Sequence, residues 1–149
     1  MVPQDRQQGD GHGDELVRFL LRETGDRLFF VLQYEARSWR ALYLSSAAEA
    51  LLAETADDDL AAMLGGFRQD GRTNTRIESS FDIGEFYCSL QLFGGLVMIH
   101  FYEPGDEGVI FGFDPAAASH LTDFVSTTIP YVRRVGLDGL GEEPDWESD

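Results

Sequence analysis

The sequence predicts one α/β domain of the α+β type, built on a five-stranded, mainly antiparallel sheet with helices before, between and after its strands. Two observations support this fold class. Helix-length segments with a periodic apolar face alternate with short, strand-length apolar runs, in the order helix, two strands, helix, three strands, helix. The chain has 149 residues, of which 43% are hydrophobic, which is enough for one domain with a proper core.

The first part of the chain predicts a helix followed by a pair of strands. Residues 14–24 have an apolar face with helical spacing, and Gly25 follows them as a stop signal. The runs 28–34 and 39–44 are rich in aromatic and aliphatic residues, which is typical of strands. The short polar segment between them predicts a turn.

A second helical region follows in two pieces. Ser46 and Glu49 have the spacing of a capping box, which predicts a helix start at this point. The acidic run 57–59 is typical of a second helix cap a few residues later. The glycines at 65–66 predict the end of this helix, and we expect residues 68–76 to form a polar loop.

The second half of the chain predicts three strands and a last helix. The glycine pair 94–95 and the segment 104–106 separate the strands as turns. Asp114 with Pro115 directly behind it is a strong helix start, and Pro130 marks the expected end of that helix. The three strands are expected at residues 85–93, 96–103 and 108–113.

The character of the strands predicts their order in the sheet. Residues 28–32, 96–101 and 109–113 lack any alternation of apolar and charged side chains, as is typical of strands that are covered on both faces. The strands at 39–44 and 85–93 carry polar residues and therefore fit the two edges. The order 2-1-5-4-3, numbered along the chain, keeps both hairpins and buries the apolar strands.

A two-residue turn at 94–95 fixes the register of the hairpin 85–103. In this register Cys88, Leu90 and Leu92 belong to the core face. The opposite face is aromatic and uncharged, and we expect it to be used for self-association or for docking of a protein partner. Its residues are Tyr87, Ser89, Gln91, Met98, His100 and Tyr102.

The composition is strongly acidic and contains no lysine. Eleven arginines stand against 27 Asp and Glu, which gives a formal net charge of -16 and a pI near 4.3. In dilute buffer such a surface repels itself, whereas at about 1 M salt the Debye length falls to about 3 Å. We therefore expect a protein from a salt-accumulating cell.

The same composition limits the possible partners and the location. Nucleic-acid binding requires clustered basic residues, and the pair Arg133-Arg134 is too small a patch to provide them. No apolar run reaches the ~20 residues of a membrane span, and the polar N-terminus does not have the pattern of a signal peptide. We expect a cytoplasmic protein that binds neither nucleic acid nor membrane.

The ends of the chain differ in composition from its centre. Residues 1–12 are polar and rich in glycine, and residues 136–149 are acidic without any basic residue. We expect both segments to be disordered and to flank a single domain at residues 13–135. Trp146 in the acidic tail is a candidate docking motif.

Candidate catalytic and metal-binding residues are few. Ser89 next to His100 suggests a nucleophile and a base, but Glu103 points to the other face and no Gly-x-Ser-x-Gly elbow is present. The single Cys88 permits no intrachain disulfide and no cysteine-based zinc site, and the histidines lack the spacing of metal ligands. We expect no enzyme activity, no cofactor and no metal.

The order of elements over residues 14–129 resembles the roadblock/LC7 fold of the profilin-like group. The segments 42–44, 84–90 and 108–115 also resemble a family of small uncharacterised haloarchaeal proteins. The first resemblance implies a non-catalytic homodimer that acts as a regulatory platform or scaffold for a protein partner such as a small GTPase or another signalling component. The alternative is a small-molecule sensor, since profilin-like folds also hold ligands between sheet and helix.

We predict that folding depends on salt, because the net charge of -16 is screened only at high ionic strength. The melting temperature followed by circular dichroism should fall steadily as potassium chloride is lowered from molar to millimolar concentrations. Thermal stability that stays the same at low salt would contradict this prediction.

Overall fold

The computed structural model describes residues 11–117, 121–137 and 139 of the chain. The predicted acidic tail at 136–149 lies mostly outside these residues, as does Trp146, so these expectations stay predictions. The predicted lead at 1–12 is described only at its last two positions, where the first helix begins. At the other end Leu137, beyond the expected domain limit, is buried.

The sheet has the predicted strand order. Five antiparallel strands lie in the order β2-β1-β5-β4-β3, which confirms the α+β fold. Both hairpins are present, and β5 lies in the middle of the sheet between β1 and β4. The strands are β1 (Leu28–Tyr34), β2 (Trp39–Leu44), β3 (Cys88–Phe93), β4 (Leu96–Glu103) and β5 (Glu107–Phe113).

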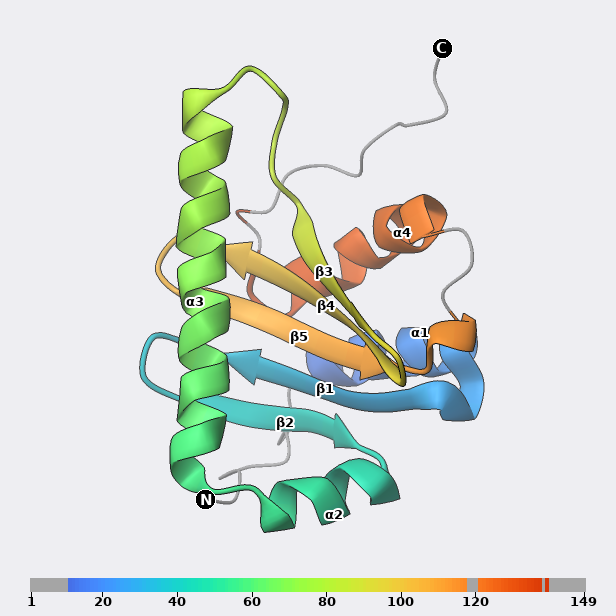
Figure 1. Cartoon of the computed structure of the whole chain (residues 1–149). Coiled ribbons are helices and arrows are strands. Elements are labelled where there is room, and N and C mark those ends of the chain that lie inside the picture. The colour runs from blue at the N-terminus through green and yellow to red at the C-terminus, as the bar shows by residue number, and fades with distance from the viewer. Residues whose placement is uncertain (1–10, 118–120, 138, 140–149) are drawn as a thin grey trace.

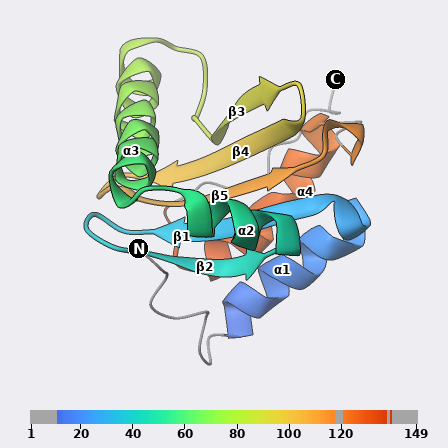
Figure 2. The ribbon, with the colours of Figure 1, turned by 60° about the horizontal axis from the view of Figure 1, so that its bottom comes forward.

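Four α-helices cover the two faces of this sheet among the described residues. In Figure 1 the long helix α3 crosses the front of the sheet, whereas α1 and α4 lie behind it. Figure 2 shows α2 next to the start of α3. The helices are α1 (Gly11–Thr24), α2 (Ser46–Glu54), α3 (Asp57–Ser80) and α4 (Leu121–Arg134), with short 3₁₀ turns at Gly25–Arg27 and Pro115–Ala117.

The covered sheet has a separate apolar cluster on each face. The larger cluster joins residues such as Leu20 of α1 and Ile129 of α4 to Phe111 at the centre of the sheet. The smaller cluster joins Phe67 of α3 to Ile110 and neighbouring residues of the other face. Because β1, β4 and β5 are covered on both faces, they need the continuous apolar runs seen in the sequence.

Helix α3 differs most from the sequence prediction. The expected helix end at 65–66 and the expected loop at 68–76 are wrong, because one continuous helix of 24 residues spans both. Its buried residues, Leu60, Leu64, Phe67 and Gly71, follow one another every three or four positions and so form a single stripe against the sheet. Burial of this stripe outweighs the cost of about 1 kcal/mol that each interior glycine adds to a helix.

Smaller corrections concern the ends of three elements. The N-cap of α2 is Ser45, whose hydroxyl accepts from the backbone N–H of Ala48 at 3.1 Å, one residue before the predicted start. Strand β3 begins at Cys88 and not at residue 85, after Gly84 with its positive φ of 95°. Pro130 lies inside α4 and does not end it, because buried apolar residues on either side hold this segment against the sheet.

Gly71 permits a close approach between α3 and the sheet. A side-chain carbon at this position would overlap the ring of Tyr102 on β4. By contrast, a side-chain carbon at Gly65 or Gly66 of the same helix would meet no other atom within 4 Å. The three glycines of α3 therefore have different roles, and only Gly71 is required by packing.

We predict opposite effects of alanine at these positions. Gly71→Ala should destabilise the protein by about 1–3 kcal/mol, because the ring of Tyr102 must move away from its buried position. The control Gly65→Ala should stabilise the protein by up to about 1 kcal/mol through helix propensity alone. Chemical denaturation in high salt measures both, and equal effects of the two substitutions would contradict the close approach.

Candidate functional site

Strand β3 is an edge strand with an apolar surface. It pairs with β4 on one side and ends the sheet on the other. Leu90 is 39% exposed, Leu92 is 70% exposed and Phe93 is 51% exposed, although all three are large apolar side chains. An edge of this kind is a template for pairing with another strand.

The predicted register of the β3–β4 hairpin is confirmed. Cys88 pairs with Phe101, Leu90 with Ile99 and Leu92 with Val97 on the face of α1 and α4. On the other face Ser89 pairs with His100, and Gln91 with Met98. The two-residue turn that follows Phe93 sets this register.

The face expected to serve as an open interface is largely covered within the subunit. Met98, His100 and Tyr102 are only 8%, 1% and 5% exposed, because α3 packs over them. These three side chains are therefore not on the surface of the subunit where a second copy could meet them. The cause is the length of α3, of which residues 68–76 were expected to form a loop. Ser89 is half-buried beside them, and Gln91 is exposed.

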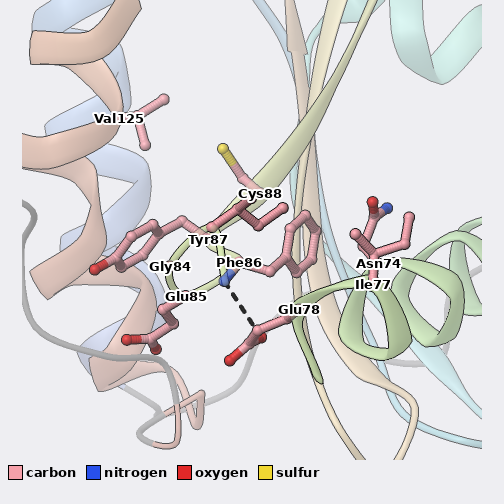
Figure 3. A pocket seen from close by; sticks show the side chains of 10 residues that line it. Asn74, Ile77, Glu78, Gly84, Glu85, Phe86, Tyr87, Cys88 and Val125 are labelled. Atoms are coloured by element: carbon pink, nitrogen blue, oxygen red, sulfur yellow. Dashed lines mark hydrogen bonds between the residues drawn. The ribbon is translucent and has the colours of Figure 1, made fainter. Parts of the chain in front are cut away.

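Tyr87 lies on the opposite face from the one predicted. It precedes β3, so the alternation of the strand does not reach it, and it packs against the cluster of α1 and α4. Figure 3 shows Tyr87 turned toward Val125 of α4, whereas Phe86 points toward α3. Tyr87 is therefore not on the same face as Tyr102.

A network of polar side chains connects α3 to the covered face. The hydroxyl of Ser89 donates to Oδ2 of Asp70 at 2.6 Å, and Nδ1 of His100 lies 3.4 Å from the same oxygen. The amide of Asn74 donates to Oδ1 of Asp70 at 3.1 Å. The hydroxyl of Tyr34 on β1 lies 2.6 Å from Nε2 of His100.

Burial and the hydrogen-bond partners of His100 together determine its protonation state. Burial lowers the pKa of the imidazole to about 4, although the hydrogen bond and charge of Asp70 act in the opposite direction. Burial also raises the pKa of Tyr34, so that its hydroxyl stays protonated and can donate. The consistent arrangement is a neutral His100 that donates from Nδ1 to Asp70 and accepts at Nε2 from Tyr34.

This arrangement does not activate Ser89 as a nucleophile. The expectation that no acid faces His100 is wrong, because Asp70 of α3 lies between the serine and the histidine. However, Ser89 donates to the carboxylate and not to the imidazole, and Nε2 is occupied by Tyr34. A catalytic triad requires the histidine between the other two groups, so these three side chains do not form one.

A second group of contacts anchors α3 at the turn between β4 and β5. Arg72 donates to both carboxylate oxygens of Asp106, at 3.1 and 2.7 Å, and Tyr102 donates to Asp106 at 2.8 Å. The hydrogen bond from Arg72 holds the pKa of Asp106 below its usual value. One turn earlier Arg68 donates to the carbonyl of Glu35 at 2.6 Å. Together these contacts fix the long axis of α3 across the sheet.

A cavity of about 350 Å³ lies beside the start of β3 (Figure 3). The backbone N–H of Phe86 donates to Oε1 of Glu78 at 3.3 Å, which ties this segment to the end of α3. Burial raises the pKa of the Cys88 thiol to about 12, so that the thiol is unreactive at neutral pH. The lining residues are Asn74, Ile77, Glu78, Ile83, Gly84, Glu85, Phe86, Tyr87, Cys88 and Val125.

Within the described part of the chain, no group of three or more His, Cys, Asp or Glu side chains is arranged to hold a metal ion. None of the helices in these ranges combines the length and the apolar character that a membrane crossing requires.

Asp70 is the site residue that the sequence analysis missed. Only a correct prediction of α3 would have placed it near Ser89 and His100.

Comparison with known proteins identifies the family. Residues 14–132 match a domain of unknown function, DUF7522, and the chain therefore belongs to this family. The comparisons with curated proteins and with solved structures gave no match.

We predict that the buried His100 makes stability depend on pH. Its pKa is about 4 in the folded chain and 6.5 as the ordinary value, so on acidification the unfolded state binds the proton first. The stability that the neutral His100 contributes is fully present above pH 6.5 and is lost as the pH falls toward 4. The free energy of unfolding then decreases by up to about 3 kcal/mol.

Denaturant unfolding at several pH values measures this dependence, and His100→Gln is the matched control. Glutamine keeps a donor and an acceptor at this position but does not titrate. The difference between the two proteins isolates the imidazole from the many surface carboxylates. The same pH slope in both proteins between pH 4 and 6.5 would show that His100 is not held neutral.

Proposed function

We propose that this protein is a non-catalytic homodimeric scaffold whose two subunits join through β3 and which docks a regulatory protein partner. The observation that carries the proposal is the free edge of β3, with three large apolar side chains exposed along it. Pairing of this edge with its copy would continue the sheet across both subunits and cover these side chains.

The alternation of β3 restricts how two copies can pair. A twofold axis perpendicular to the sheet keeps each face on its own side, so a residue must lie opposite a residue of the same face. Pairing Leu90 with the partner's Leu90 places Cys88 opposite the partner's Leu92. This register brings every apolar residue of that face of β3 into contact with another apolar residue.

The other face of β3 carries two polar residues, Ser89 and Gln91, and ends at Phe93. In the same register Ser89 lies opposite the partner's Gln91, beside α3. Because Ser89 is held by Asp70 at 2.6 Å, the backbone at the centre of β3 is already ordered before pairing. A strand that is already ordered loses less conformational entropy when two subunits associate.

The role as a platform is supported by the fold and by the nature of the polar network. The strand order and the placement of the helices agree with the resemblance to roadblock/LC7 proteins, which implies docking of a signalling component such as a small GTPase. A non-catalytic role is supported by the contacts around His100, in which Ser89 donates to Asp70 and Nε2 of His100 faces the Tyr34 hydroxyl. The acidic composition and the resemblance to haloarchaeal proteins support action in a salt-accumulating cytoplasm.

We predict that Leu92→Asp converts a dimer into a folded monomer. The substitution places two carboxylates in the proposed interface while the buried residues of the subunit remain unchanged. Light scattering in high salt at micromolar protein concentration measures the mass. The control Leu51→Asp changes a similarly exposed leucine on α2, 58% exposed, and should remain dimeric. A monomeric wild-type protein would overturn the proposal.

A crosslinking experiment tests the register itself. Opposite residues of an antiparallel pair have Cα atoms about 4.5–5.5 Å apart, which suits a disulfide. Leu90→Cys lies opposite the same residue of the other copy in this register, and it should therefore form a covalent dimer on mild oxidation. The control Gln91→Cys lies opposite the partner's Ser89 and should not link to its own copy. Crosslinking of both variants alike would contradict this register.

A further inference from the structure

An apolar groove of about 390 Å³ lies between α2, the beginning of α3 and the sheet. We call it the α2 groove. Its floor is formed by side chains of β1 and β4, its walls by the two helices, and one end by the turn between β3 and β4. It is lined by Phe29, Phe30, Leu32, Leu44, Ala48, Leu51, Leu52, Thr55, Asp59, Leu60, Met63, Phe93, Gly95, Leu96 and Met98.

The chemistry of this lining is almost entirely hydrocarbon. Thr55 and Asp59 are the only polar side chains in it. The hydroxyl of Thr55 donates to the backbone carbonyl of Leu51 at 2.7 Å, so it is already used within α2. Asp59 lies in the first turn of α3, where the adjacent residues Asp57 and Asp58 are also acidic.

The groove exists because α2 is poorly packed against the sheet. Of its nine residues only Ala48 is buried, although the helix carries two leucines. Leu51 remains 58% exposed at one side of the groove, and Phe93 remains 51% exposed at another. Apolar side chains at the opening of a concave apolar site are typical of a binding site for a small molecule.

We propose that the α2 groove binds a small amphiphile with an aliphatic or aromatic body and an uncharged or cationic polar end beside Asp59. Its volume lies within the range of about 300–1,000 Å³ that is usual for ligand sites. The body of the ligand would complete the apolar core that α2 leaves open. This inference does not depend on the dimer through β3.

The charge of the groove lining determines which polar group the ligand can carry. No lining residue is basic, so an anionic end would meet only apolar surface and the carboxylate of Asp59. Burying a carboxylate without a partner is costly even where salt screens long-range repulsion. A hydroxyl can instead donate to Asp59, and an ammonium group can form an ion pair with it.

The methionines of the chain offer a direct measurement. Two of its three methionines, Met63 and Met98, line the groove, whereas Met1 lies outside the described residues. With ¹³C-labelled methionine methyl groups, titration of the full chain with 1-octanol or octylammonium should shift the signals of Met63 and Met98 and leave that of Met1 unchanged. The shifts should saturate in the millimolar range or below, whereas octanoate should bind at least about ten-fold more weakly.

Three variants complete the experiment. Ala48→Phe places a ring in the groove and should abolish the saturable shifts, while the control Ala53→Phe, at an exposed position of the same helix, should bind as the wild type does. Asp59→Asn changes an exposed residue, so it tests the ligand class even if Ala48→Phe fails to fold. It should weaken binding of octylammonium relative to that of 1-octanol.

Several results would overturn the proposal. They are the absence of saturable shifts with all three probes, equal shifts of all three methionines, and tighter binding of octanoate than of 1-octanol. Movement of the Met63 and Met98 signals on dilution without ligand, if it persists in the Leu92→Asp variant, would show that a second copy of the chain occupies the groove instead. The dimer test by light scattering is independent of each of these results.

Discussion

The close contact between α3 and the sheet is the constraint on which most of the structure depends. At Gly71 the helix backbone approaches the ring of Tyr102 so closely that no side chain fits between them. This approach brings Asp70 within hydrogen-bonding distance of Ser89 and His100, and it brings Arg72 to Asp106. A larger residue at position 71 would therefore disturb packing and both polar anchors together.

The contact also determines what the covered face can do. Because α3 buries His100 and Tyr102, these residues become part of the subunit and are withdrawn from any outer surface. A neutral histidine with both nitrogens in hydrogen bonds has no free atom with which to accept a proton from a substrate. Among the described residues, the apolar surfaces that α3 leaves open include the edge of β3 and the groove beside α2.

The sequence predicted the sheet well because strand character is local. The uninterrupted apolar runs of β1, β4 and β5 require cover on both faces, and the glycine pair at 94–95 fixes the β3–β4 register. The sequence-based prediction was wrong at α3. The glycines at 65–66 are a typical signal for the end of a helix, but the stripe of buried residues continues on both sides of them. Since Asp70 was assigned to a loop, its contact with Ser89 could not be predicted.

Phe93 connects the two surfaces that remain open. It is the last residue of β3, and its side chain also lines the α2 groove. A ligand that orders Phe93 in the groove would fix the end of the strand that pairs with a second copy. Binding and association would then be linked, and thermodynamic reciprocity requires each to change the other by the same factor. Phe93 is therefore the residue through which the two proposals, the dimer through β3 and the ligand in the α2 groove, would affect each other.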